Sequence, residues 1–150
     1  MRVYLVIMDE TEEASTALRF AASRATRTGG QVHLLALIPR QQFVAFSAIQ
    51  ATIEEEARAR AEALVTSAAG SLMGGAADPP SIAVRQGESV SVIREYLAEH
   101  PEVSALVLGA AANGGPGPLV QHFASMAGQL PCPVYIIPGG MSEAELERLS

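Results

Sequence analysis

The chain has 150 residues, of which 49 % are hydrophobic and 17 % charged, and its mean hydropathy is +0.22. These values predict one ordinary globular domain and exclude a disordered chain. All ten basic residues are arginine. The absence of lysine excludes a P-loop ATPase, whose lysine reaches the phosphates, and it excludes Schiff-base chemistry, which needs a lysine amine.

Charge and cysteine content limit the partners further. The net charge of −6 argues against a nucleic-acid binder, because phosphate contacts need a basic face. No apolar run approaches the ~18 residues of a membrane span. The single cysteine, Cys132, cannot form an internal disulfide, which favours a reducing compartment. Three scattered histidines and this cysteine show no metal-site spacing, so no metal is expected.

Apolar runs alternate with helical patterns along the chain. The runs predict five strands, at 3–8, 32–38, 82–84, 103–108 and 131–138. Four helices are predicted between them, namely one from the Thr11 cap to Gly29, one with an apolar stripe over 49–68, one over 90–97 and one over 120–127. Ser142 and Glu145 form a capping-box pattern for a short last helix. Residues 40–48, with Phe43 and Phe46, and 70–80 are expected to be loops.

Strands that alternate with helices predict a parallel sheet with helices on both faces, because each parallel connection needs a crossover. Ligands in such sheets bind beyond the carboxyl ends of the strands, where the strand order reverses. The candidate site therefore consists of the segments that follow strands one, two and four. They are Asp9–Glu10, 37–40 and 109–118.

Two of these segments carry chemistry. Asp9 can accept hydrogen bonds from a ribose or an adenine edge, or it can simply bond the backbone of the turn that opens the helix. The glycines of 109–118 can bring backbone N–H groups to an anion, although Pro116 and Pro118 lack that group. The same loop can also be a plain connector. His122 and Ser125 have no acidic partner nearby and no nucleophile elbow surrounds them, so no catalytic residue is predicted.

These features, in this order, resemble the universal stress protein family. The residues that carry the resemblance are the first strand ending in Asp9, the glycine-rich loop after 106–109, and the closing segment 130–138. The resemblance covers residues 1–138 and leaves 139–150 as a short helical tail. It implies a three-layer, Rossmann-like fold of the adenine-nucleotide alpha-hydrolase-like type. It also implies a bacterial, cytoplasmic, dimeric stress-response protein that binds ATP or AMP and is not an enzyme, with weak ATPase activity left open.

The resemblance extends to the nucleotide site only in part. Asp9 matches the acidic residue of the family, Leu37 matches the strand-two position that meets adenine, and Gly109 matches the first glycine of the phosphate loop. Ala112 stands where the second glycine belongs, and the final Gly-Ser/Thr pair is replaced by 122–123 or, counted from the other end, by 120–121. The remaining loop candidates are Asn113, Gly114, Gly115 and Gly117.

Two functions follow from this departure. In the first, the chain is a dimer that binds an adenine nucleotide weakly. In the second, it has lost nucleotide binding and is a dimeric interaction module. The predicted dimer edge is the last strand, with Val134, Tyr135, Ile136 and Ile137, because an apolar unpaired edge favours pairing with a second chain. The alternative is that 139–150 folds back over this edge.

Overall fold

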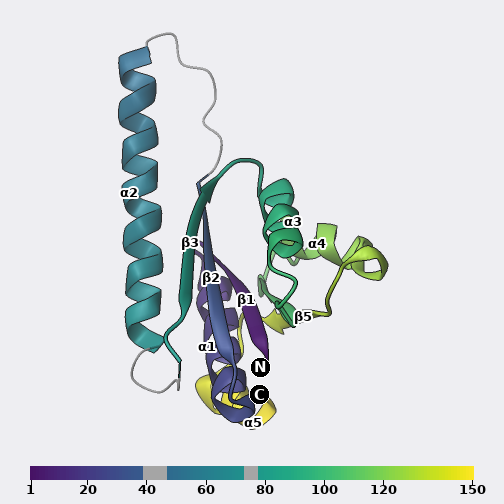
Figure 1. Ribbon diagram of the computed structural model, residues 1–150. Coiled ribbons are helices and arrows are strands. Elements are labelled where there is room, and N and C mark those ends of the chain that lie inside the picture. The colour runs from purple at the N-terminus through teal and green to yellow at the C-terminus, as the bar shows by residue number, and fades with distance from the viewer. Residues whose placement is uncertain (39–46, 73–77) are drawn as a thin grey trace.

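The computed structural model describes residues 1–38, 47–72 and 78–150. They form a five-stranded parallel sheet in the order β3-β2-β1-β4-β5, with helices on both faces (Figure 1). The predicted fold class is thus confirmed. The strands are β1 (Val3–Met8), β2 (Gln31–Ile38), β3 (Ser81–Gln86), β4 (Ala105–Ala110) and β5 (Val134–Pro138). The helices are α1 (Glu12–Thr28), α2 (Ser47–Leu72), α3 (Ser89–Glu99), α4 (Pro118–Ser125) and α5 (Glu143–Leu149), with a 3-10 turn at Ala127–Gln129.

The first βαβ unit follows local signals closely. β1 is buried along its whole length and lies at the centre of the sheet, which explains its continuous apolar run. The Thr11 hydroxyl accepts the Ala14 N–H at 3.2 Å and caps α1. Gly29 ends the helix in the left-handed conformation at φ 64°, which glycine adopts without strain.

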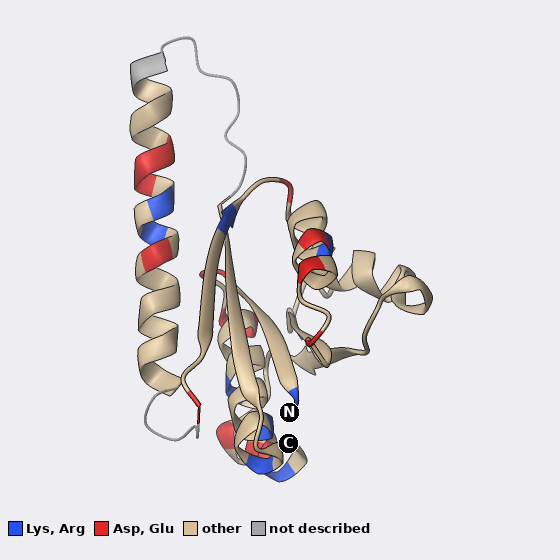
Figure 2. Ribbon diagram, viewed as in Figure 1, with Lys and Arg blue, Asp and Glu red and all other residues tan. Residues whose placement is uncertain are grey.

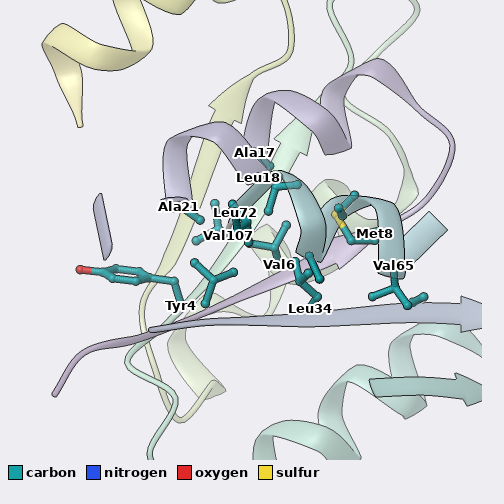
Figure 3. Packing of buried hydrophobic residues seen from close by; sticks show 14 of the residues in the cluster. Tyr4, Val6, Met8, Ala17, Leu18, Ala21, Leu34, Val65, Leu72 and Val107 are labelled. Carbon is teal, nitrogen blue, oxygen red and sulfur yellow. The ribbon is translucent and has the colours of Figure 1, made fainter. Parts of the chain in front are cut away.

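Two hydrophobic clusters fill the two sides of the sheet. One lies between the sheet and α1, α2 and α5, with Val6, Leu34 and Val107 from the central strands at its centre (Figure 3). The small Ala17 and Ala21 let α1 approach the sheet closely. The other cluster lies under α3 and α4. Helices α1 and α2 therefore cover one face and α3 and α4 cover the other, as right-handed crossovers require, while α5 returns to the face of α1 (Figure 1).

The structure corrects some predicted boundaries. β4 begins two residues later than predicted, and α2 continues through 70–72, where a loop was expected. Leu72 is buried on the sheet, and its burial offsets the cost of Gly70 in a helix. Ile49 was expected on the packed stripe of α2 but is 49 % exposed. Ile49 is in the first turn of α2, and this end of the helix extends past the strands (Figure 1). Phe43 and Phe46 lie outside the described residues.

The last helix packs on the first one. The capping box that the sequence predicted is present, with mutual hydrogen bonds between Ser142 and Glu145. Leu146 is buried against α1, and Glu143 pairs with Arg19 at 3.4 Å. α5 thus lies on α1, while Ile136 on the outer strand remains 43 % exposed. No helix in the described part of the chain is long and apolar enough to span a membrane.

Candidate functional site

Three adjoining hollows lie at the carboxyl end of the sheet, and all three are bordered by Asp9. Their volumes are about 280, 260 and 370 Å³. They lie around the end of β1, which has β2 on one side and β4 on the other. The strand order reverses here, because β2 and β3 extend the sheet in one direction and β4 and β5 extend it in the other. This is the switch point at which open parallel sheets bind ligands. The expected location of the site is therefore a real concavity.

Asp9 has a local role in the turn that leads into α1. Its Oδ1 atom accepts the backbone N–H of Thr11 at 2.9 Å and the Thr11 hydroxyl at 2.5 Å. The carboxylate thereby orders the residue that caps the helix. Both hydrogen bonds end on Oδ1, and Oδ2 makes no hydrogen bond with the residues that the structure describes. The carboxylate is exposed, so a ligand can reach this second oxygen.

The first hollow lies between β2 and α2. Leu37 lines it from the sheet, and Ala57, Ala61 and Leu64 line it from the helix. These side chains form an apolar wall suited to one face of a planar base. Arg60 is also in this wall. It lies three residues after Ala57 and four before Leu64, so helical spacing places it on the same face of α2.

The second hollow lies between α1 and the loop before α4. Gly109, Gly117 and Pro118 line it on the loop side, and Glu13 lines it on the α1 side. Pro118 is the first residue of α4 and offers no N–H, so this helix start has fewer donors for an anion than usual. Figure 2 shows that α4 and its preceding loop carry no charged side chain.

Gly109 is required for packing. A Cβ at this position would overlap the carbonyl oxygen and the carbonyl carbon of Glu13. The glycine thus lets the first turn of α1 lie directly on the end of β4. Gly114, Gly115 and Gly117 have φ of 77°, 91° and 99°. L-residues rarely adopt such values, which explains why glycine recurs in this loop.

The third hollow adds the start of α3, which the sequence reasoning missed. Glu88 caps this helix and accepts the N–H groups of Val90 at 3.2 Å and Ser91 at 2.9 Å. These hydrogen bonds, with the one from the Ser91 hydroxyl, lower the pKa of the Glu88 carboxyl. Glu88 and Ser89 border the hollow together with Leu37 and Asp9. The signal for this region was weak, because glutamate is an uncommon N-cap residue.

The structure thus brings together some of the predicted site residues. Asp9, Leu37, Gly109 and Gly117 border the three hollows. Asn113, Gly114 and Gly115 are exposed and do not line these hollows. Among the described lining residues the acids are Asp9, Glu10, Glu13 and Glu88, and the only basic residue is Arg60. The site is therefore acidic on balance.

The other polar candidates do not assemble into a catalytic group. Ser125 donates its hydroxyl proton to the backbone carbonyl of His122 at 2.7 Å, rather than to the imidazole. The His122 Nε2 atom is buried, with no hydrogen-bond partner among the described residues. Cys132 is half-buried, and burial raises the pKa of its thiol. No cluster of three potential metal ligands occurs within 1–38, 47–72 and 78–150.

Solved structures with the same arrangement of elements are universal stress proteins. UspA of Lactobacillus plantarum is 20 % identical, with 91 % of this chain and 97 % of that chain covered and a TM-score of 0.77. The Archaeoglobus fulgidus protein in complex with dAMP is 23 % identical, with 91 % and 97 % covered and a TM-score of 0.56. The Arabidopsis thaliana protein with AMP bound is 15 % identical, with 92 % of each chain covered and a TM-score of 0.61.

At these identities the solved structures establish the fold alone. Among curated protein sequences no significant match is found. The sequence model of the universal stress protein family matches residues 1–138, which is most of the chain. The chain therefore belongs to the universal stress protein family.

Proposed function

We propose that this member of the family binds an adenine nucleotide at the carboxyl end of the sheet and favours AMP over ATP. The observation that carries the proposal is that Asp9 borders all three adjoining hollows. The base lies against Leu37 and the apolar wall of α2, and the ribose hydroxyls donate to the free oxygen of Asp9. The similar structures of Archaeoglobus fulgidus and Arabidopsis thaliana hold dAMP and AMP.

The preference for a monophosphate follows from the charges. The hollow beside the loop contains the carboxylates Asp9 and Glu13, and its described lining residues include no basic side chain. Pro116 and Pro118 also remove two donors. Each missing contact to a charged phosphate costs about 1.5–3 kcal/mol, which is roughly a 10- to 100-fold loss of affinity. A single phosphate needs fewer such contacts than a triphosphate, so AMP loses less.

The proposal also covers the oligomeric state, the activity, the compartment and the domain bounds of the protein. The protein is a homodimer that pairs through β5, and the half-exposed edge of this strand supports this. It is a binding protein rather than an enzyme, because no side chain among the described residues is positioned to act as a general base. Its compartment is the bacterial cytoplasm. Residues 1–138 form the binding domain, and 139–150 form an attached tail.

The test is a thermal-shift and calorimetric titration of the full chain with adenosine, AMP and ATP. AMP is expected to stabilise the protein more than ATP at equal concentration. At 100 times the dissociation constant, a ligand adds about 2.7 kcal/mol to the free energy of unfolding. Asp9→Ala is expected to abolish the AMP-induced shift. Asp78→Ala, which changes an exposed aspartate far from the hollows in sequence, is the matched control.

The alternative function predicts a different result. If millimolar adenosine, AMP and ATP all leave the melting temperature unchanged, the nucleotide proposal is wrong and the dimeric interaction module is favoured. Asp9→Asn separates the role in the turn from the role in binding. Its amide oxygen still accepts the Thr11 N–H, so folding should be retained while nucleotide binding is weakened.

A further inference from the structure

A larger hollow of about 630 Å³ lies at the other end of the molecule. Its floor comes from the first residues of β1 and β2 and from β3, and its wall comes from the end of α3 and the turn that follows. The polar residues that line it include His33, Arg85, Tyr96, His100 and Glu102. A cavity of this size suits a small organic ligand, for which about 300–1,000 Å³ is usual. The nucleotide proposal does not use any of these residues.

Tyr96 fixes both histidines. Its hydroxyl is 2.8 Å from the Nδ1 atom of His33, and its backbone carbonyl accepts a hydrogen bond from Nδ1 of His100 at 2.9 Å. The rings of Tyr96 and His100 stack at 3.9 Å, and the His33 ring lies perpendicular to both. The two imidazoles are therefore held in place before any ligand arrives.

These contacts also set the tautomers. A carbonyl can only accept, so His100 carries a proton on Nδ1 and its neutral ring presents Nε2 as an acceptor. Burial lowers the pKa of His33 and raises that of Tyr96, so His33 is neutral and Tyr96 keeps its hydroxyl proton. That hydroxyl has no other partner among the described residues, so it donates to His33 Nδ1. His33 then presents Nε2–H as a donor.

Neither Nε2 atom is used within the described residues. Both histidines line the hollow. Arg85 adds further donors. One of its terminal nitrogens pairs with Glu99 at 2.7 Å, while the guanidinium lies 5.0 Å from the centroid of the Tyr96 ring. The other N–H groups of the guanidinium make no hydrogen bond with the residues that the structure describes.

We propose that this hollow is a second ligand site, and that it binds a small organic carboxylate when His100 is protonated. Protonation turns its Nε2 from an acceptor into a donor. The carboxylate then receives hydrogen bonds from His33, His100 and Arg85, which are the donors that suit it. The apolar body of the ligand lies on Val3 and Ala83.

Charged and titratable groups surround His100 on β2, β3 and α3. Arg85 from β3 and Glu99 from α3 neutralise each other. His33 from β2 and Tyr96 from α3 are uncharged near neutral pH, as described above. Glu102 lies on the rim and is exposed, and its negative charge would repel a bound anion. Binding in this form takes up a proton at His100, so it strengthens as the pH falls, and removal of the Glu102 charge should strengthen it further.

The test uses succinate as the probe and succinamide as its uncharged analogue, each titrated calorimetrically into the full chain at pH 6.0 and 8.0. Succinate is expected to bind at least about five-fold more tightly at pH 6.0 than at 8.0, because the bound form carries one more proton than the free protein. Succinamide is expected to bind at neither pH. Inorganic phosphate is a separate arm, and phosphate binding as tight as that of succinate would overturn the carboxylate assignment.

Three variants locate the site. His100→Asn keeps a side-chain donor near the Tyr96 carbonyl but removes Nε2, and Arg85→Gln removes the guanidinium. Both are expected to lower succinate affinity at pH 6.0 by about ten-fold, as loss of a charge-assisted hydrogen bond does. Glu102→Gln is expected to raise it. Binding that none of the three changes, or no succinate binding at pH 6.0, would overturn the proposal. AMP binding at the opposite end serves as the check on folding.

Discussion

The carbonyl oxygen of Glu13 in α1 occupies the space that any side chain on Gly109 in β4 would need. The glycine that corresponds to the first position of the family's phosphate loop is thus also the contact point between a helix and the sheet. Its presence therefore has a packing reason that is independent of any nucleotide. Stability and ligand binding can be separated at this residue.

Gly109→Ala is expected to lower the free energy of unfolding by about 1–3 kcal/mol, because a methyl group forced into a packed contact displaces backbone. Gly70→Ala is the matched control. A Cβ at Gly70 meets no atom within 4 Å, and alanine favours the helix by about 0.5–1 kcal/mol. Urea unfolding of both variants measures the difference. Unchanged stability of Gly109→Ala together with lost AMP binding would contradict the packing role.

Glu13→Gln tests the electrostatic basis of the AMP preference. The carboxylate of Glu13 borders the hollow beside the loop, where a triphosphate would extend. Removing one partly exposed like charge is worth up to about 1 kcal/mol, so ATP affinity should rise by about two- to five-fold and adenosine affinity should stay constant. Glu12→Gln changes the preceding residue, which does not line the hollow, and should have no effect. An equal gain for adenosine would contradict the electrostatic explanation.

The sequence predicted the fold well because its strongest signals are local. The buried run of β1, the Thr11 cap, the Gly29 stop and the Ser142 capping box each act within a few residues, and each is confirmed. The errors concern positions that depend on distant contacts. Ile49 has the right spacing for a packed stripe but is 49 % exposed, because the first turns of α2 extend past the sheet (Figure 1).

The candidate site was less predictable for the same reason. Asp9 and Leu37 could be named because the ends of buried strands can be recognised in the sequence. Arg60 and Glu88 reach the hollows from α2 and from the start of α3, and neither stands at a strand end, where the sequence placed the site. The histidine cluster likewise joins His33 of β2 and Tyr96 of α3, which are 63 positions apart.

The buried His33 predicts that stability falls in mild acid. Burial holds the pKa of this imidazole below its ordinary value of 6.5. The unfolded chain therefore takes up the proton first as the pH falls, so stability is full above about pH 6.5 and declines as the pH drops from there towards the lower folded pKa. Urea unfolding from about pH 5 to 8 in a carboxylate-free buffer measures this decline.

His33→Asn is the control for this titration. Asparagine keeps a polar group near the Tyr96 hydroxyl but does not titrate. Its stability is expected to be lower than that of the native chain at pH 8 and to change less between about pH 5 and 6.5, since the proton uptake of residue 33 in the unfolded chain is removed. Parallel pH profiles for the two proteins would show that His33 is not the group responsible.

The two edges of the sheet provide a matched test of the dimer. Ile136 on β5 and Ile82 on β3 are both edge-strand isoleucines, exposed to 43 % and 48 %. If dimers pair through β5, Ile136→Asp places two charges at the interface, where burial without a partner is costly, and the protein should become a monomer of 15.7 kDa. Ile82→Asp should remain a dimer of twice that mass. Light scattering after size-exclusion chromatography gives both masses. The reverse pattern would assign dimerisation to β3, because each substitution adds the same charge to an equally exposed edge.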